Sequence, residues 1–142
     1  MSADYPSMTT AEIRSKFLNF FEERGLKLYP SSSLVPDDPS LLLANAGMNQ
    51  FKEYYQGKKT MKEIGAISCQ KCVRTNDIDC IGEDGRHLSF FEMLGDFSFG
   101  GISKQQACAW AFELITKEFK LPLDRLYFTV FTEDDETHDV WR

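Results

Sequence analysis

The sequence of 142 residues has no long apolar run and no excess of basic residues. No apolar stretch approaches the roughly 20 residues that a membrane-spanning helix needs, and residues 1–7 lack the basic and apolar pattern of a signal peptide. We therefore expect no membrane partner and a cytoplasmic location. A net charge of −6 argues against a chain that binds nucleic acid by itself, because such proteins usually carry a basic face.

Histidine is scarce as well, with two residues, and the chain has four cysteines. Cys69 and Cys72 form a CxxC pair, but no second such pair and no His pair follows at zinc-finger spacing. On a strand, positions three apart face opposite sides, so this pair would need a turn to hold one ion. We expect reduced, structural cysteines and no metal site. The acidic run 133–136 is interpreted as a solvated turn after a strand.

A first helix is marked at both of its ends. Thr9 followed by Glu12 fits a capping box, in which each side chain accepts a hydrogen bond from the backbone of the other residue. Gly25 stands where a glycine commonly ends a helix. Between them one apolar stripe recurs at helical spacing, formed by Ile13, Phe17, Phe20 and Phe21. We expect a structural helix here, with residues 1–8 before it as a flexible tail.

Weaker patterns predict the other elements. A second long helix is expected from Ser103 to about Lys120, and a shorter one over 49–56. Short strands are expected at 26–29 and 41–43, and a half-buried strand at 126–132, where aromatic and branched residues alternate. No repeat and no long linker divides the chain, so the pattern favours one domain that mixes helices and strands.

The stretch from Ser68 to Gly100 predicts two strands joined by a polar loop that contains glycine. The first strand is expected over 67–74, and the second from His87 to Phe91 and onward. Side chains alternate between the two faces of a strand. One face of the first strand would therefore carry Gln70, Cys72 and Arg74, and one face of the second would carry His87, Ser89, Phe91 and Met93.

If these strands pair, Arg74, His87 and Phe91 converge on one surface. A guanidinium grips phosphate through its planar fork, and an aromatic ring stacks on a base, so the set would suit a nucleotide. The alternative is an ordinary hairpin, in which Arg74 and His87 are solvated and the aromatic side chains belong to the core.

Five strings of the chain stand in a defined order: AEIRSKFLNFFEERG (11–25), SSSLVP (31–36), NAGMNQF (45–51), QKCVR (70–74) and RHLSFFEMLGDFSFG (86–100). Together they resemble the class II aminoacyl-tRNA synthetases, and more narrowly the alanyl-tRNA synthetase family. They cover nearly the whole chain after residue 8, and their combination is highly specific. The resemblance implies an α+β fold in which helices flank a mainly antiparallel sheet that is incomplete in this chain.

The resemblance also implies an activity, the joining of alanine to tRNA(Ala). Alanine would be activated by ATP to alanyl-adenylate, with Mg²⁺ present, and then transferred to the tRNA. Arg74 would be the motif 2 arginine, a catalytic residue on the α-phosphate. Arg86 or His87 would contact the outer phosphates, Phe91 would stack on adenine, and Met93 would join the ATP-binding set.

Three further site residues follow from the resemblance less directly. Met48 and Asn45, in the turn of the NAGMNQF string, would border the aminoacyl-adenylate. Asp77, in the motif 2 loop, would orient the ligand or the tRNA end. By pattern alone Met48 would be a core residue. Pro36 is the best candidate for the motif 1 proline.

The chain also departs from the family pattern. Leu88 stands where many relatives carry a second His, the loop 75–85 lacks their GGKH segment, and 101–103 replaces their acidic-aromatic pair. No motif 3 is present, so residues 9–142 would be the amino-terminal part of the catalytic domain and inactive alone. The alternative is a free-standing synthetase-like paralogue that binds a nucleotide or a protein partner without aminoacylation. Exposed edges of an incomplete sheet would favour self-association of the isolated chain.

Overall fold

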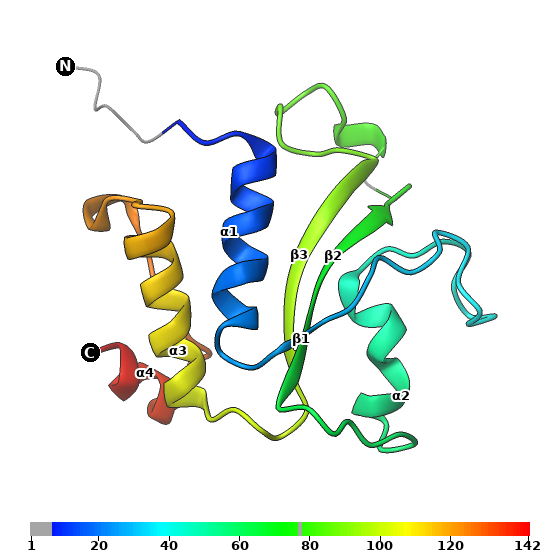
Figure 1. Ribbon diagram of the computed structural model, residues 1–142. Coiled ribbons are helices and arrows are strands. Elements are labelled where there is room, and N and C mark those ends of the chain that lie inside the picture. The colour runs from blue at the N-terminus through cyan, green and yellow to red at the C-terminus, as the bar shows by residue number, and fades with distance from the viewer. Residues whose placement is uncertain (1–6, 77) are drawn as a thin grey trace.

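The computed structural model describes residues 7–76 and 78–142 (Figure 1). The helices and strands in chain order are α1 (Thr10–Glu22), β1 (Lys27–Leu28), η1 (Gly47–Phe51), α2 (Lys52–Tyr55), β2 (Gly65–Val73), η2 (Ile78–Cys80), β3 (Phe90–Ser98), α3 (Lys104–Glu113), η3 (Leu114–Glu118), η4 (Leu123–Arg125) and α4 (Asp135–Trp141). Helices α1 and α3 lie on one side of the sheet, and η1 with α2 lies on the other. The predicted α+β class is confirmed.

Helix α1 begins and ends as predicted. The Thr9 side chain accepts a hydrogen bond from the Glu12 backbone, and the Glu12 carboxylate accepts one from the Thr9 backbone N–H at 2.7 Å. At the other end Gly25 has φ +88, and the N–H groups of Gly25 and Leu26 donate to Glu22 and Phe21, as in a Schellman motif. The stripe buries Phe17, Phe20 and Phe21 against Leu26, Ile67 and Leu114.

Replacing Thr9 by alanine is expected to lower the free energy of unfolding by about 0.5–2 kcal/mol, because the cap of α1 is lost. Urea unfolding followed by circular dichroism measures this loss. The matched control is Thr10→Ala, which removes the same atoms from the first helical residue and is expected to be neutral or slightly stabilising. Equal losses in the two variants would show that the cap contributes nothing specific.

The described strands form one sheet in the order β1-β2-β3. Strand β1, inside the predicted strand at 26–29, is parallel to β2, whereas β2 and β3 are antiparallel from Gly65 opposite Ser98 to Val73 opposite Phe90. In this register Gln70 faces Met93 and Cys72 faces Phe91. The predicted sharing of faces by these four residues is therefore confirmed.

The prediction that the second strand begins at His87 is wrong, because β3 begins at Phe90. The Asp84 carboxylate accepts hydrogen bonds from the backbone N–H groups of Arg86 at 2.8 Å and His87 at 3.0 Å. These N–H groups close a turn and are not available to the ladder. At its other end the strand continues past Phe91 to Ser98, in line with the expected continuation.

Two other predicted strands are also wrong. Residues 41–43 contain no strand: Leu41 closes a turn by donating to the Asp38 carbonyl, and Leu42 is 86% exposed. Residues 126–132 have no ladder partner within the described chain, and Tyr127 is 91% exposed. An alternating pattern of side chains forms a strand only where the edge of a neighbouring strand is free to pair with it. The acidic run follows no strand either, since Asp134 caps α4.

Both remaining predicted helices are present, but each includes a turn that is not α-helical. The helix expected over 49–56 begins earlier, as the 3₁₀ turn η1, and Gly57 with φ +69 follows it. The helix expected from Ser103 is capped by that serine and continues through η3 to Glu118. Within the described residues, no helix combines the length and apolar composition that a bilayer span requires.

Candidate functional site

Arg74 and Phe91 lie together where β2 ends and β3 begins. The guanidinium carbon of Arg74 is 5.3 Å from the centroid of the Phe91 ring, within the range of a cation–π contact. The Arg74 backbone N–H donates to the carbonyl of Ser89 at 2.9 Å, which extends the ladder by one bond. The predicted convergence of this cation and this ring on one face is confirmed.

The predicted neighbour Asn45 lies beside them. Its backbone carbonyl accepts a hydrogen bond from Arg74 Nε at 3.1 Å, and the adjacent Ala44 carbonyl accepts one from Val73 N–H at 2.9 Å. No described residue accepts a hydrogen bond from the two terminal nitrogens of Arg74. The guanidinium is therefore held at one nitrogen and offers its terminal fork to a ligand.

Met93 shares the strand face of Phe91, and Met48 follows Gly47, which contacts Met93. The Gly47 N–H points at Met93 Sδ at 3.1 Å, and a Cβ on Gly47 would stand 3.1 Å from the Phe97 ring, so a side chain there would require the ring to shift by a few tenths of an ångström. Met48 follows Gly47 and is 47% exposed, so its placement in the core by pattern is wrong. Its exposure suits a residue that borders a ligand.

Arg86 and His87 are not joined to this group by any contact between described residues. Both are exposed in the segment before β3, and His87 Nδ1 lies 2.6 Å from the Asp84 carboxylate. Within the described residues the His87 side chain pairs with Asp84, and its predicted convergence with Arg74 stays a prediction. Asp77 lies outside the described residues.

Backbone hydrogen bonds from Arg86 and His87 hold the pKa of Asp84 at about 2. Because its pKa is lowered, ionised Asp84 stabilises the folded turn. This stabilisation is fully present above the ordinary pKa of an aspartate, near 4, and is lost as the pH falls towards 2. We expect the protection of the Arg86 and His87 amides, that is, the intrinsic exchange rate at each pH divided by the observed rate, to fall over this range, as measured by NMR. In Asp84→Asn, whose oxygen accepts without titrating, this protection should not change with pH; an unchanged profile would contradict the assignment.

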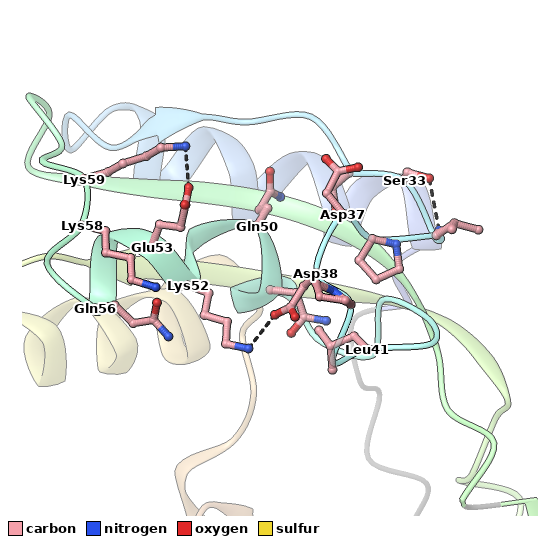
Figure 2. Close-up of a pocket in the computed structure, with 15 residues that line it drawn as sticks. Ser33, Asp37, Asp38, Leu41, Gln50, Lys52, Glu53, Gln56, Lys58 and Lys59 are labelled. Carbon is pink, nitrogen blue, oxygen red and sulfur yellow. Dashed lines mark hydrogen bonds and ion pairs between the residues drawn. The ribbon is translucent and has the colours of Figure 1, made fainter.

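A hollow lies elsewhere, between the segment 32–41 and α2 (Figure 2). It encloses about 620 Å³ and includes Pro36 among its lining residues. Figure 2 shows Lys52 directed at Asp38, at 2.6 Å, and Lys59 directed at Glu53, at 2.5 Å. Hydrogen bonds from Lys52 and Ser40 hold the pKa of Asp38 well below its usual range. Lys52 and Lys59 are therefore paired with carboxylates, whereas Lys58, the third lysine of the lining, forms no ion pair with a described residue.

Gln70 has a structural role that sequence reasoning missed. Its side chain is fully buried, accepts hydrogen bonds from the Ser32 N–H at 2.8 Å and hydroxyl at 3.0 Å, and donates to the Ser32 and Lys71 carbonyls. It thereby joins the segment of three serines to the sheet. The sequence offered one signal of this role: Gln70 stands between Ser68 and Cys72 on one face of the strand.

The CxxC cysteines lie on opposite sides of β2, as their spacing predicts. Cys72 is fully buried opposite Phe91, and burial raises the pKa of both Cys69 and Cys72. Both thiols are therefore disfavoured as thiolates, the form that binds metal. Across the described residues, no three His, Cys, Asp or Glu side chains gather as a metal ion would require.

Comparison with known proteins gives a consistent result. Residues 12–142 match the family model of class II (A) tRNA synthetases. The chain is 51% identical to an alanine–tRNA ligase of Synechocystis sp. over all its 142 residues, and 50% identical to one of Pseudothermotoga lettingae over 135 residues, 95% of the chain. It is 54% identical over 91% of its length to a chloroplastic/mitochondrial alanine–tRNA ligase of Sorghum bicolor. The chain spans 16%, 16% and 13% of these relatives, respectively.

Proposed function

Because the chain belongs to the class II tRNA synthetase family, we propose that it is part of an alanine–tRNA ligase and carries the nucleotide-binding surface of that enzyme. The relatives named above support alanine and tRNA(Ala) as the substrates of the whole protein. The single observation that carries the nucleotide site is the pairing of Arg74 with Phe91.

The adenylation step needs what this surface offers. The carboxylate of alanine attacks the α-phosphorus of ATP in line, pyrophosphate leaves, and both reacting groups are anionic. Catalysis therefore depends on alignment and on neutralised charge more than on covalent chemistry. The free fork of Arg74 would hold two oxygens of the α-phosphate, and Phe91, within cation–π reach of that fork, would stack on adenine.

Magnesium would accompany ATP rather than occupy a site built by this chain. The described residues supply no cluster of carboxylates for a resident ion, and Mg²⁺ is commonly bound through substrate phosphates, water and one or two carboxylates. Its contribution when bound would be to neutralise phosphate charge. The residues of this chain would bind and orient the nucleotide.

Calorimetric titration of the chain with Mg–ATP tests the proposal. ATP should bind, and adenosine should bind at least tenfold more weakly, because it lacks the phosphates that Arg74 grips. Lys52→Ala, which removes a lysine of the hollow, should leave the ATP affinity unchanged. Absence of ATP binding, or equal binding of adenosine, would overturn the proposed site.

We also propose that the isolated chain associates with itself through strand edges. Within the described residues, the edge of β3 away from β2 is unpaired, and 126–132 is an alternating segment without a partner. Such edges tend to pair with neighbouring chains. Analytical ultracentrifugation over a concentration series should detect dimers, and Tyr127→Lys, at an exposed position, should reduce them. A monomer at every concentration would count against this proposal.

A further inference from the structure

Arg74 lies just past the end of β2, where strand pairing fixes its backbone but not its side chain. The one hydrogen bond from the guanidinium to a described residue runs from Nε to the carbonyl of Asn45. Because a guanidinium is planar, a bond at Nε restricts the plane in which both terminal nitrogens lie. The Asn45 carbonyl therefore sets the direction of the fork.

Asn45 belongs to a segment without regular secondary structure, so its neighbours determine its position. On one side Ala44, fully buried, accepts the hydrogen bond from Val73. On the other side Asn49 Nδ2 donates to Asn45 Oδ1 at 3.1 Å, four residues along the chain. The hydrogen bond to the Ala44 carbonyl and the hydrogen bond to the Asn45 side chain therefore restrain the segment whose carbonyl accepts from Arg74.

Asn49 is fixed in turn by η1. Its N–H donates to the Ala46 carbonyl at 3.3 Å. Two residues later Phe51 is 1% exposed, and its ring centroid lies 4.8 Å from that of Phe97 on β3. Asn49 therefore links the buried side chain of Phe51, two residues along η1, to Asn45, which contacts Arg74.

We propose that Asn49 is a positioning residue for Arg74. Its amide holds Asn45 so that the Asn45 carbonyl aims the guanidinium at an anionic group of the ligand. The identity of that ligand, a nucleotide phosphate, rests on the proposed function, whereas the positioning rests on the contacts alone. The two parts are tested separately.

Two substitutions at Asn49 separate the hydrogen bond from the bulk of the side chain. Asn49→Ala removes the donor. Asn49→Asp cannot donate, but the Asn45 amide can turn over and donate its own Nδ2 to the new carboxylate, which restores the bond. We therefore expect a loss in the alanine variant and a rescue in the aspartate variant. Asn49→Leu, similar in volume and without a donor, replaces the alanine variant if that fails to fold.

The readout for positioning is the NMR signal of the Arg74 Nε–Hε group, assigned by its disappearance in Arg74→Lys. Exchange of this proton with solvent should accelerate about two- to tenfold in Asn49→Ala, which corresponds to the loss of one hydrogen bond. It should stay unchanged in Asn49→Asp. Gln50→Ala is the matched control, since the Gln50 amide contacts Pro30 and Gln70 instead. Unchanged exchange in Asn49→Ala, or failure of the aspartate rescue, would overturn the proposal.

The readout for the ligand is the dissociation constant of Mg–ATP, which should rise about two- to tenfold in Asn49→Ala. Asn49→Asp serves only the exchange readout, because its added negative charge also repels the phosphates of ATP. If the exchange pattern holds but the unaltered chain binds no ATP, the positioning role stands and the proposed function fails. If ATP binds and Asn49→Ala alters neither its affinity nor the exchange, the proposed function stands and the positioning role is overturned.

Discussion

Replacing Arg74 by alanine is expected to weaken Mg–ATP binding to the chain about 100-fold, a loss close to complete at accessible concentrations. The variant loses a bidentate, charge-assisted contact to phosphate and the cation over the Phe91 ring. In the whole alanine–tRNA ligase of which we propose this chain is a part, alanine-dependent ATP–pyrophosphate exchange should fall about 100- to 1,000-fold, the usual cost of removing one preorganised charge from a transition state. Calorimetry and isotope exchange measure the two effects.

Arg14→Ala is the matched control for this experiment. Arg14 lies on α1 and donates to Glu92 of β3 at 2.6 Å, so it contacts the same strand from the opposite face of the sheet. Losing this partly exposed ion pair should leave ATP affinity unaltered and change stability little, because exposed ion pairs contribute little. If Arg74→Ala and Arg14→Ala bind ATP equally well, the site has been assigned to the wrong face.

Phe51→Ala is expected to have the largest effect on stability, about 3–5 kcal/mol of unfolding free energy. Phe51 is 1% exposed, and its ring lies within 6 Å of three other aromatic rings, those of Tyr29, Phe97 and Phe99. Removing the ring leaves a cavity between η1 and the sheet. Urea unfolding measures the loss.

The control for Phe51 is Leu42→Ala, because Leu42 lies in a segment expected to be a strand but is 86% exposed. Its replacement should change the free energy of unfolding by less than about 0.5 kcal/mol. A loss of stability at Leu42 as large as that at Phe51 would mean that the Leu42 side chain is buried and not exposed. Since η1 carries Asn49, Phe51→Ala should weaken ATP binding as well.

The parts of the fold that follow from local rules could be predicted from the sequence. The cap of α1 depends on Thr9 and Glu12, which lie three residues apart, and its end depends on Gly25. The faces of the hairpin depend on strict alternation, which placed Arg74 and Phe91 together without knowledge of any other element. Resemblance supplied the role of these residues and the class of the fold.

The parts that depend on tertiary partners could not be predicted. Residues 126–132 have the alternation of a strand but no edge to pair with in the described chain. The start of β3 depends on Asp84, whose carboxylate competes with the ladder for two N–H groups. The contact between Arg74 and Asn45 uses a backbone carbonyl, which every residue possesses, so no residue type reveals it.

The most direct test of the central claim is to map Mg–ATP onto the chain by NMR. Backbone and side-chain signals would be followed during a titration of the protein labelled with ¹⁵N. We expect the largest chemical-shift changes at Arg74, Phe91 and Asn45, and smaller changes at Lys52 and Lys59 in the hollow beside α2. Largest shifts at those two lysines, with the signals of Arg74 and Phe91 unmoved, would contradict the central claim.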